Sequence, residues 1–368
     1  MSSAPVQPTS HSEQQPFSVR TARTICADLF AHREWIYWTD LCVCLVLGYG
    51  GALWFFSLPW FTLEQLVVLC VSGFALFRMG TFIHEVQHFP PGVMQRFARF
   101  WEVACGVPML MPSFFYDSHL DHHRSTTYGT RRDGEYLPLA TGPLRHFAVY
   151  ALEALLIPIF VGVRFAVLTP VSFLHPKLRR VILERFSFYG INPGYRRTLP
   201  APGPPRWWAV VEWACFARCM ATLAVILLGL YTWDHLTQYY LLAVFTLGLN
   251  YVRNLIAHRY RNQGEQLSYL EQLDDSCNLE SRNPLTELFF PLGLRYHALH
   301  HLLPTLPYHN LYAAHRRLMA ELPADSPYRA TVLRSFSEGV RQLWNESRAA
   351  RMASKVDAAT PDVRAEAA

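Results

Sequence analysis

The chain has 368 residues, of which 51% are hydrophobic and 17% are charged, and its formal net charge is +5. A typical soluble domain carries about 25% charged residues, so this composition favours an integral membrane protein over a soluble one. The modest charge comes without a compact basic run interleaved with aromatic residues, which argues against nucleic acid as a partner. The eight cysteines form no C-x-x-C pair and indicate no disulfide framework.

The two ends of the chain differ in composition from the middle. Residues 1–20 are polar and rich in Ser, Gln and Pro, so we expect a disordered N-terminal tail, and no cleavable signal peptide is visible. Residues 346–368 are rich in Ala and charged residues, and we expect a polar C-terminal tail. The residues between them, 21–345, are expected to form a membrane domain.

Four apolar segments are long enough to cross a bilayer as helices, which takes about 20 residues. They are residues 36–57, 64–83, 211–231 and 237–256. Only a few residues separate the first from the second and the third from the fourth. The sequence therefore predicts an all-α integral membrane protein with two transmembrane helical hairpins, hence four spans.

Two further apolar segments are ambiguous, and charge decides how we interpret them. Residues 99–115 contain two prolines, and residues 146–168 contain Glu153, Pro158 and Arg164. Residues 170–207 carry seven basic side chains against one acid, which marks them as cytoplasmic together with both chain ends. We therefore expect both ambiguous segments to be interfacial or re-entrant helices beside a cytoplasmic helical cap. The alternative is a six-span protein.

Histidines recur in three tight clusters next to the predicted spans. The clusters are "HEVQH" (His84, His88), "HLDHH" (His119, His122, His123) and "HALHH" (His297, His300, His301). Residues three or four apart share one face of a helix, so each cluster can direct two or three imidazoles the same way. All three clusters fall on the predicted cytoplasmic side, where we expect them to converge.

Eight imidazoles exceed what one metal ion needs, since a catalytic zinc takes three protein ligands and a water. The clusters therefore predict two metal ions, although imidazole alone does not say which metal. Asn250, Asn254 and His258 form a polar stripe along the fourth predicted span, and such a stripe is costly in a membrane unless it has a function. We predict His258 as a ninth metal ligand and Asn254 as a residue that holds a water at a metal.

The first cluster also matches the H-E-x-x-H pattern of zinc proteases, with Glu85 after His84. A zinc protease needs those two histidines, the glutamate as base and one further ligand, and it has no use for the other clusters. An intramembrane zinc protease therefore stays only as a weaker alternative.

Three histidine clusters in this order and spacing make the chain resemble the membrane fatty acid desaturase family, from about the first span to about residue 315. The resemblance implies a histidine-ligated non-heme di-iron site, O2 as co-substrate, and introduction of a double bond into an acyl lipid. Glu85 stands where many members have Asp, and the third cluster lacks the initial Gln of one desaturase subtype. Lipid or carotenoid hydroxylases and ketolases have similar clusters and remain an alternative.

The sequence and the resemblance together also indicate an electron donor and a location. No fused cytochrome b5 heme motif is visible, so the electrons should come from a separate donor of ferredoxin or cytochrome b5 type. Arg greatly outnumbers Lys, which hints at a bacterial protein, and we expect it in the inner membrane with its active site on the cytoplasmic face. Four carboxylates are candidates to hold the distal imidazole N–H groups: Glu85, Asp121, Asp133 and Glu135.

Overall fold

The computed structural model describes residues 17–281 and 283–359, with side chains as far as residue 354. Most of the predicted N-terminal tail, residues 1–16, lies outside these residues, and a short helix, α1 (Val19–Ile25), begins just after it. Long helices dominate the described residues, and their only strands are the two-residue β1 (Asn278–Leu279) and β2 (Val332–Leu333). The predicted all-α membrane fold is confirmed.

The first predicted hairpin forms and packs closely. Helix α2 (Glu34–Leu45) continues through a π-helical turn, residues 46–50, into α3 (Gly51–Ser57), and α4 (Leu63–His88) returns beside it. Ser72 on α4 donates a hydrogen bond to the carbonyl of Gly48 at 2.8 Å. A Cβ on Gly51 would lie 2.9 Å from Cβ of Ser72. Small residues thus let the two backbones approach, as is common between membrane helices.

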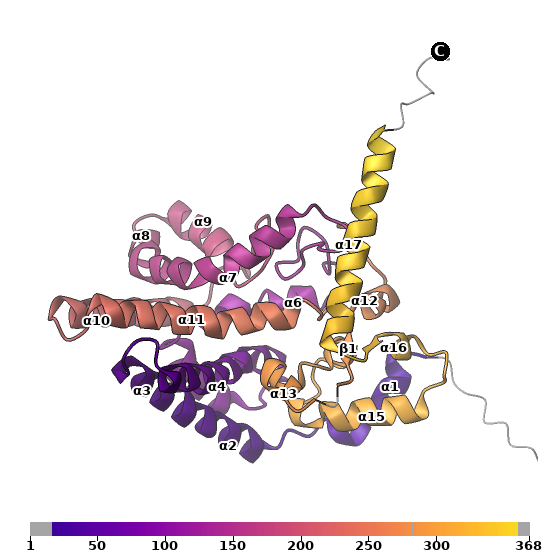
Figure 1. Ribbon diagram of the computed structural model, residues 1–368, viewed down its shortest axis with the longest axis horizontal. Helices are drawn as coiled ribbons and strands as arrows, with labels where there is room; N and C mark the ends of the chain where they lie inside the picture. The colour runs from indigo at the N-terminus through magenta and orange to yellow at the C-terminus, as the bar shows by residue number, and fades with distance from the viewer. Residues whose placement is uncertain (1–16, 282, 360–368) are drawn as a thin grey trace, which may run out of the picture.

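The second predicted hairpin consists of α10 (Arg206–Leu227) and α11 (Trp233–Asn254). In Figure 1 its turn marks one end of the molecule, and α11 runs from there back toward the short helices of the cap. Helix α11 packs against α4, where a Cβ on Gly73 would lie 2.3 Å from the Phe245 ring. Helix α7 (Arg145–Val163) lies against the other side of α11, and Tyr150 donates to the carbonyl of Tyr251 at 2.6 Å.

The helices of the structure that are long and apolar enough to cross a membrane differ slightly from the four spans predicted from the sequence. The four helical stretches that are long and apolar enough are Glu34–Ser57, Leu63–His88, Arg145–Ser172 and Arg206–Leu227. Three of them match predicted spans. The fourth is α7 with its continuation through α8 (Thr169–Ser172), which we had expected to be interfacial or re-entrant, while α11 is absent from the set.

Buried polar contacts accommodate the charged and polar residues of α7 and α11. The span predicted at 237–256 and the interfacial or re-entrant placement of 146–168 stay predictions. Helix α7 continues through Pro158, and its basic end is neutralised because Arg164 pairs with Glu212 of α10, both fully buried. Arg179 from α9 (Pro176–Phe186) pairs with the same carboxylate. The polar residues of α11 lower its hydropathy, but several of them line internal cavities rather than facing lipid.

Short elements form the cap beside the ends of α4 and α11. The cap elements are α5 (Gln95–Trp101), α6 (His119–His122), α12 (Tyr269–Asp275), α13 (Thr286–Phe289), α14 (His297–Leu302), α15 (Leu311–Glu321) and α16 (Pro327–Ala330). β1 and β2 pair in parallel, and Asn278 in β1 accepts a hydrogen bond from the backbone N–H of Leu299 at 3.0 Å. This contact ties α14, and therefore the third histidine cluster, to the strands.

The last helix, α17 (Phe336–Ala359), begins beside the two strands, packs its first half against them and α7, and then extends away from the rest of the molecule (Figure 1). It passes through residue 346, where we had placed the start of the polar C-terminal tail, so the first part of that segment continues the helix. Residues 360–368 of the predicted tail lie outside the described residues.

Candidate metal centre

Nine histidines from four parts of the chain meet where the membrane helices join the cap. The end of α4 supplies two, α6 and the residue after it supply three, the segment after α11 supplies one, and α14 supplies three. Eight of the nine side chains are at most 9% exposed, and His123 is half-buried. The convergence predicted from helical spacing is therefore found, and His258 joins the three clusters.

The nine imidazoles divide into two groups. Within each group, one ring nitrogen of every member lies within 4.8 Å of those of all other members. Group 1 consists of His84, His88, His119, His123 and His300, and group 2 consists of His122, His258, His297 and His301. Both groups draw on α6 and α14, because the neighbouring histidines in "DHH" and "LHH" project roughly 100° apart around each short helix.

Distances between the ring nitrogens fit a metal ion inside each group. In group 2, Nε2 of His258 lies 3.0 Å from that of His122 and 2.8 Å from that of His297. In group 1, Nε2 of His300 lies 3.1 Å from those of His88 and His123. A metal bound to nitrogen at about 2.1 Å separates two ligands at right angles by about 3 Å.

Carboxylates fix which nitrogen of two imidazoles faces inward. His119 Nδ1 donates to Glu135 at 2.9 Å, and His122 Nδ1 donates to Asp133 at 2.8 Å, because an ionised carboxylate can only accept. In the neutral rings the Nε2 lone pairs then point into the groups, where only a cation can satisfy several of them at once. His84 adds to this need, since neither of its buried nitrogens has a hydrogen-bond partner in the described residues.

Of the four carboxylates that we considered for this role, two have it and two do not. Asp133 and Glu135 bond to imidazoles, as stated above. Asp121 instead pairs with Arg124 at 2.7 Å. Glu85 accepts a hydrogen bond from Tyr37 at 2.7 Å, and its other oxygen lies 4.0 Å from Nδ1 of His84, which is beyond hydrogen-bond distance. Because Glu85 faces Tyr37, it is badly placed to act as the base of a zinc protease.

Sequence reasoning missed three residues that hold the second group. Tyr128 donates to Asp275 at 2.7 Å, so its oxygen accepts from Nδ1 of His258, also at 2.7 Å. The amide of Gln272 lies 3.1 Å from Nδ1 of His301. No short motif marks these residues: Tyr128 lies in a turn 130 positions from His258, and Gln272, on α12 with Asp275, lies 29 positions from His301.

Burial acts against protonation of several of these imidazoles. Burial lowers the pKa of His258, His297 and His300 well below the usual value for histidine, and the neighbouring charges lower it further. Neutral imidazole is the form that binds a metal ion. Burial therefore favours the metal-binding form at these three positions, whereas at His122 the effect of burial is outweighed by Asp133, which raises the pKa of that imidazole.

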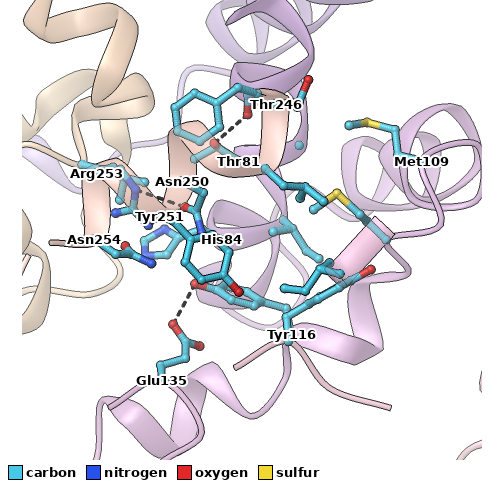
Figure 2. A pocket seen from close by; sticks show the side chains of 18 of the residues that line it. Thr81, His84, Met109, Tyr116, Glu135, Thr246, Asn250, Tyr251, Arg253 and Asn254 are labelled. Carbon is cyan, nitrogen blue, oxygen red and sulfur yellow. Dashed lines mark hydrogen bonds between the residues drawn. The ribbon is translucent and has the colours of Figure 1, made fainter. Parts of the chain in front are cut away.

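A narrow cavity of about 110 Å³ adjoins group 1. Figure 2 shows His84, Tyr116 and Glu135 on its wall together with the polar residues of α11. Asn254 faces this cavity, one helical turn before His258, and its predicted contact with a metal-bound water stays a prediction. Asn250 accepts two hydrogen bonds from Arg253.

A second, larger cavity of about 670 Å³ shares a wall with the first. Both are lined by Leu76, Met109 and Thr246, and the larger one continues to Leu230 and Leu236 beside the turn between α10 and α11. Its lining is mainly aliphatic and aromatic, and its volume lies in the range of roughly 300–1,000 Å³ that is usual for ligand sites. Together the two adjoining cavities, which we call the cavity path, extend from the far end of the helical hairpins to His84 of group 1.

Two comparisons with known proteins agree with this site. Residues 61–332 match the model of the fatty acid desaturase family. A ceramide hydroxylase of Caulobacter vibrioides (strain NA1000 / CB15N) is 37% identical over 335 residues, which cover 89% of this chain and 93% of that protein. The family match includes all three histidine clusters, and the match to the ceramide hydroxylase covers most of the chain. The chain belongs to the fatty acid desaturase family of membrane oxidoreductases.

Proposed function

We propose that this enzyme uses O2 to oxidise C–H bonds in the hydrocarbon chain of a membrane lipid at a centre of two non-heme irons. Group 1 and group 2 each hold one iron, and Asn254 holds a water beside one of the two irons. The observation that carries the proposal is a pair of imidazole groups, one of which adjoins through His84 a cavity that leads on to a larger apolar one inside a membrane protein. Membership of a family known for histidine-ligated di-iron supports iron as the metal.

The metals supply the oxidant, because no amino-acid side chain is able to take hydrogen from an unactivated methylene group. The protein's own residues do the rest. Asp133 and Glu135 hold two imidazoles in the tautomer whose Nε2 faces inward. The apolar cavity aligns the hydrocarbon chain, and its side chains keep bulk water from the reacting carbons.

Two products are compatible with this chemistry. Removal of two hydrogens gives a double bond, and the family match supports this outcome. Insertion of one oxygen gives a hydroxyl group, and the ceramide hydroxylase supports this second outcome. Both begin with abstraction of a hydrogen from the carbon nearest the metals.

We further propose that the protein lies in a bacterial inner membrane with the metal centre on the cytoplasmic face. The basic segment 170–207 supports this orientation, since basic loops stay on the cytoplasmic side. A separate ferredoxin or cytochrome b5 type protein would supply electrons, guided by charge complementarity to the basic surface.

Expression in a bacterial host of defined lipid composition, followed by mass spectrometry of the lipid extract, tests the proposal. We expect lipids that have lost two hydrogens or gained one oxygen, and loss of this product in His122→Ala. His175→Ala, an exposed histidine outside both groups, is the control and should keep the product. An unchanged yield in His122→Ala, with normal membrane insertion, would contradict the site.

A further inference from the structure

Arg253 is a buried cation at the metal end of the cavity path. Its side chain is 5% exposed and lies on the wall of the narrow cavity that also contains His84 (Figure 2). Its Nε and Nη2 donate to Oδ1 of Asn250 at 3.2 and 2.9 Å. No carboxylate within the described residues lies at ion-pair distance from it. A buried arginine without a counter-charge is costly unless its N–H groups find acceptors.

The guanidinium of Arg253 contacts fewer hydrogen-bond acceptors than those of Arg164 and Arg218. An arginine has five N–H donors, and those of Arg253 share a single acceptor atom. Arg218, on the larger cavity, reaches three different acceptors on Pro108, Thr222 and Tyr239. Arg164 has the carboxylate of Glu212. Arg253 therefore has donors to spare, and they are next to the cavity.

Other polar groups of α11 line the same narrow cavity. Asn250 lies one turn after Thr246, and Arg253 and Asn254 lie about one turn after Asn250, so the four form one stripe, which we call the α11 polar stripe. The hydroxyl of Thr246 is buried and has no hydrogen-bond partner within the described residues. The larger cavity beyond it is mainly apolar. Polarity is thus concentrated within the part of the path that is nearest the metals.

This distribution sets the orientation of a lipid in the path. A hydrocarbon tail gains by filling the apolar cavity, whereas only an oxygen acceptor satisfies the spare donors of Arg253. We propose that Arg253, supported by the α11 polar stripe, binds the carbonyl oxygen of an acyl linkage in the substrate. The tail then extends toward the turn between α10 and α11, and the enzyme oxidises a carbon only a few bonds from that carbonyl. The inference rests on the proposed function and narrows its substrate class.

Three substrates show which kind of linkage supplies the carbonyl that Arg253 binds. They are a ceramide with an amide linkage, a phosphatidylglycerol with ester linkages, and an ether-linked analogue that has no carbonyl. Each is supplied in detergent micelles to the iron-loaded enzyme with an electron donor, and tandem mass spectrometry locates the oxidised carbon. The wild type should prefer a carbonyl substrate to the ether analogue by about 10-fold or more in kcat/KM, because hydrogen bonds to charged donors are strong. The preferred linkage, amide or ester, identifies the lipid class.

Arg253→Gln and Arg253→Lys test the residue itself. Arg253→Gln should keep its iron but lose the preference for the carbonyl, mainly through a higher KM, and should oxidise several chain positions instead of one. Arg253→Lys should recover part of the preference, since it keeps the charge. The ether analogue is the matched control, because both variants should treat it much as the wild type does.

The results have distinct meanings. Oxidation of all three lipids at the same distant position, or an unchanged carbonyl preference in Arg253→Gln, would overturn the role of Arg253 while leaving the proposed function intact. Loss of iron in both variants would also overturn it, since Arg253 would then only support the metal centre. Absence of oxidation of every lipid by the iron-loaded wild type would instead refute the proposed function.

Discussion

Tyr128 should govern metal binding in group 2 although it touches no metal. Its hydroxyl donates to Asp275 and accepts from Nδ1 of His258, both at 2.7 Å, and its side chain is fully buried. Because the single hydroxyl hydrogen goes to Asp275, the proton on His258 must sit on Nδ1, and Nε2 is left free for the metal. Tyr128→Phe keeps the ring and removes only this oxygen.

The size of the effect follows from the kind of contact that is lost. Removing a group that holds a metal-binding histidine typically lowers metal affinity by about 10–100-fold. That range corresponds to roughly 1.4–2.8 kcal/mol. Ser276 lies 3.3 Å from the same Nδ1 and compensates only weakly at that distance, so we expect the middle of the range.

Chelator competition on purified protein measures this directly, by following the iron that remains bound as chelator increases. Tyr136→Phe is the matched control, because its hydroxyl donates to the same Asp275 oxygen at 2.9 Å but bonds to no imidazole. We expect Tyr128→Phe to release the group 2 iron at lower chelator concentration than Tyr136→Phe. Equal retention of iron in the two variants would refute the reasoning.

Three further predictions concern each metal group, the cavity and the helix packing. His297→Ala and His300→Ala remove ligands of different groups, so elemental analysis should find about one iron per chain in each instead of about two; normal iron in both would exclude these ligand sets. Thr246→Phe places a ring where the two cavities meet, so turnover of long-chain lipids should fall while iron stays bound; full long-chain turnover would contradict the path. Gly73→Ala brings a Cβ to within 2.3 Å of Phe245 and should cost about 1–3 kcal/mol of stability, seen as a lower Tm, whereas Gly162→Ala meets nothing within 4 Å and should not.

Helical spacing was enough to predict the metal centre because each cluster needs only a local rule. His84 and His88 share a face wherever α4 goes, and the same holds for the pairs on α6 and α14. The spacing did not predict how the rings divide between two groups. That division depends on how α6 and α14 face each other, which is decided by contacts such as Asn278 with Leu299.

The groups that support the ligands were harder to predict. Asp121 lies within "HLDHH" and Asp133 ten residues after it, yet it is Asp133 that turns inward, because the backbone N–H groups of Gly129 and Glu135 hold its carboxylate. Tyr128 carries no motif at all. A sequence window likewise does not reveal that Glu212 neutralises Arg164, whose charge counted against α7 as a span.

The metal content of the purified wild-type protein tests the central claim most directly. Elemental analysis by mass spectrometry, together with X-ray absorption at the iron edge, gives both the identity of the metal and its ligands. We expect about two irons per chain, each bound mainly by imidazole nitrogen at about 2.1 Å. A single zinc per chain without iron would contradict the account and would return the zinc protease to consideration.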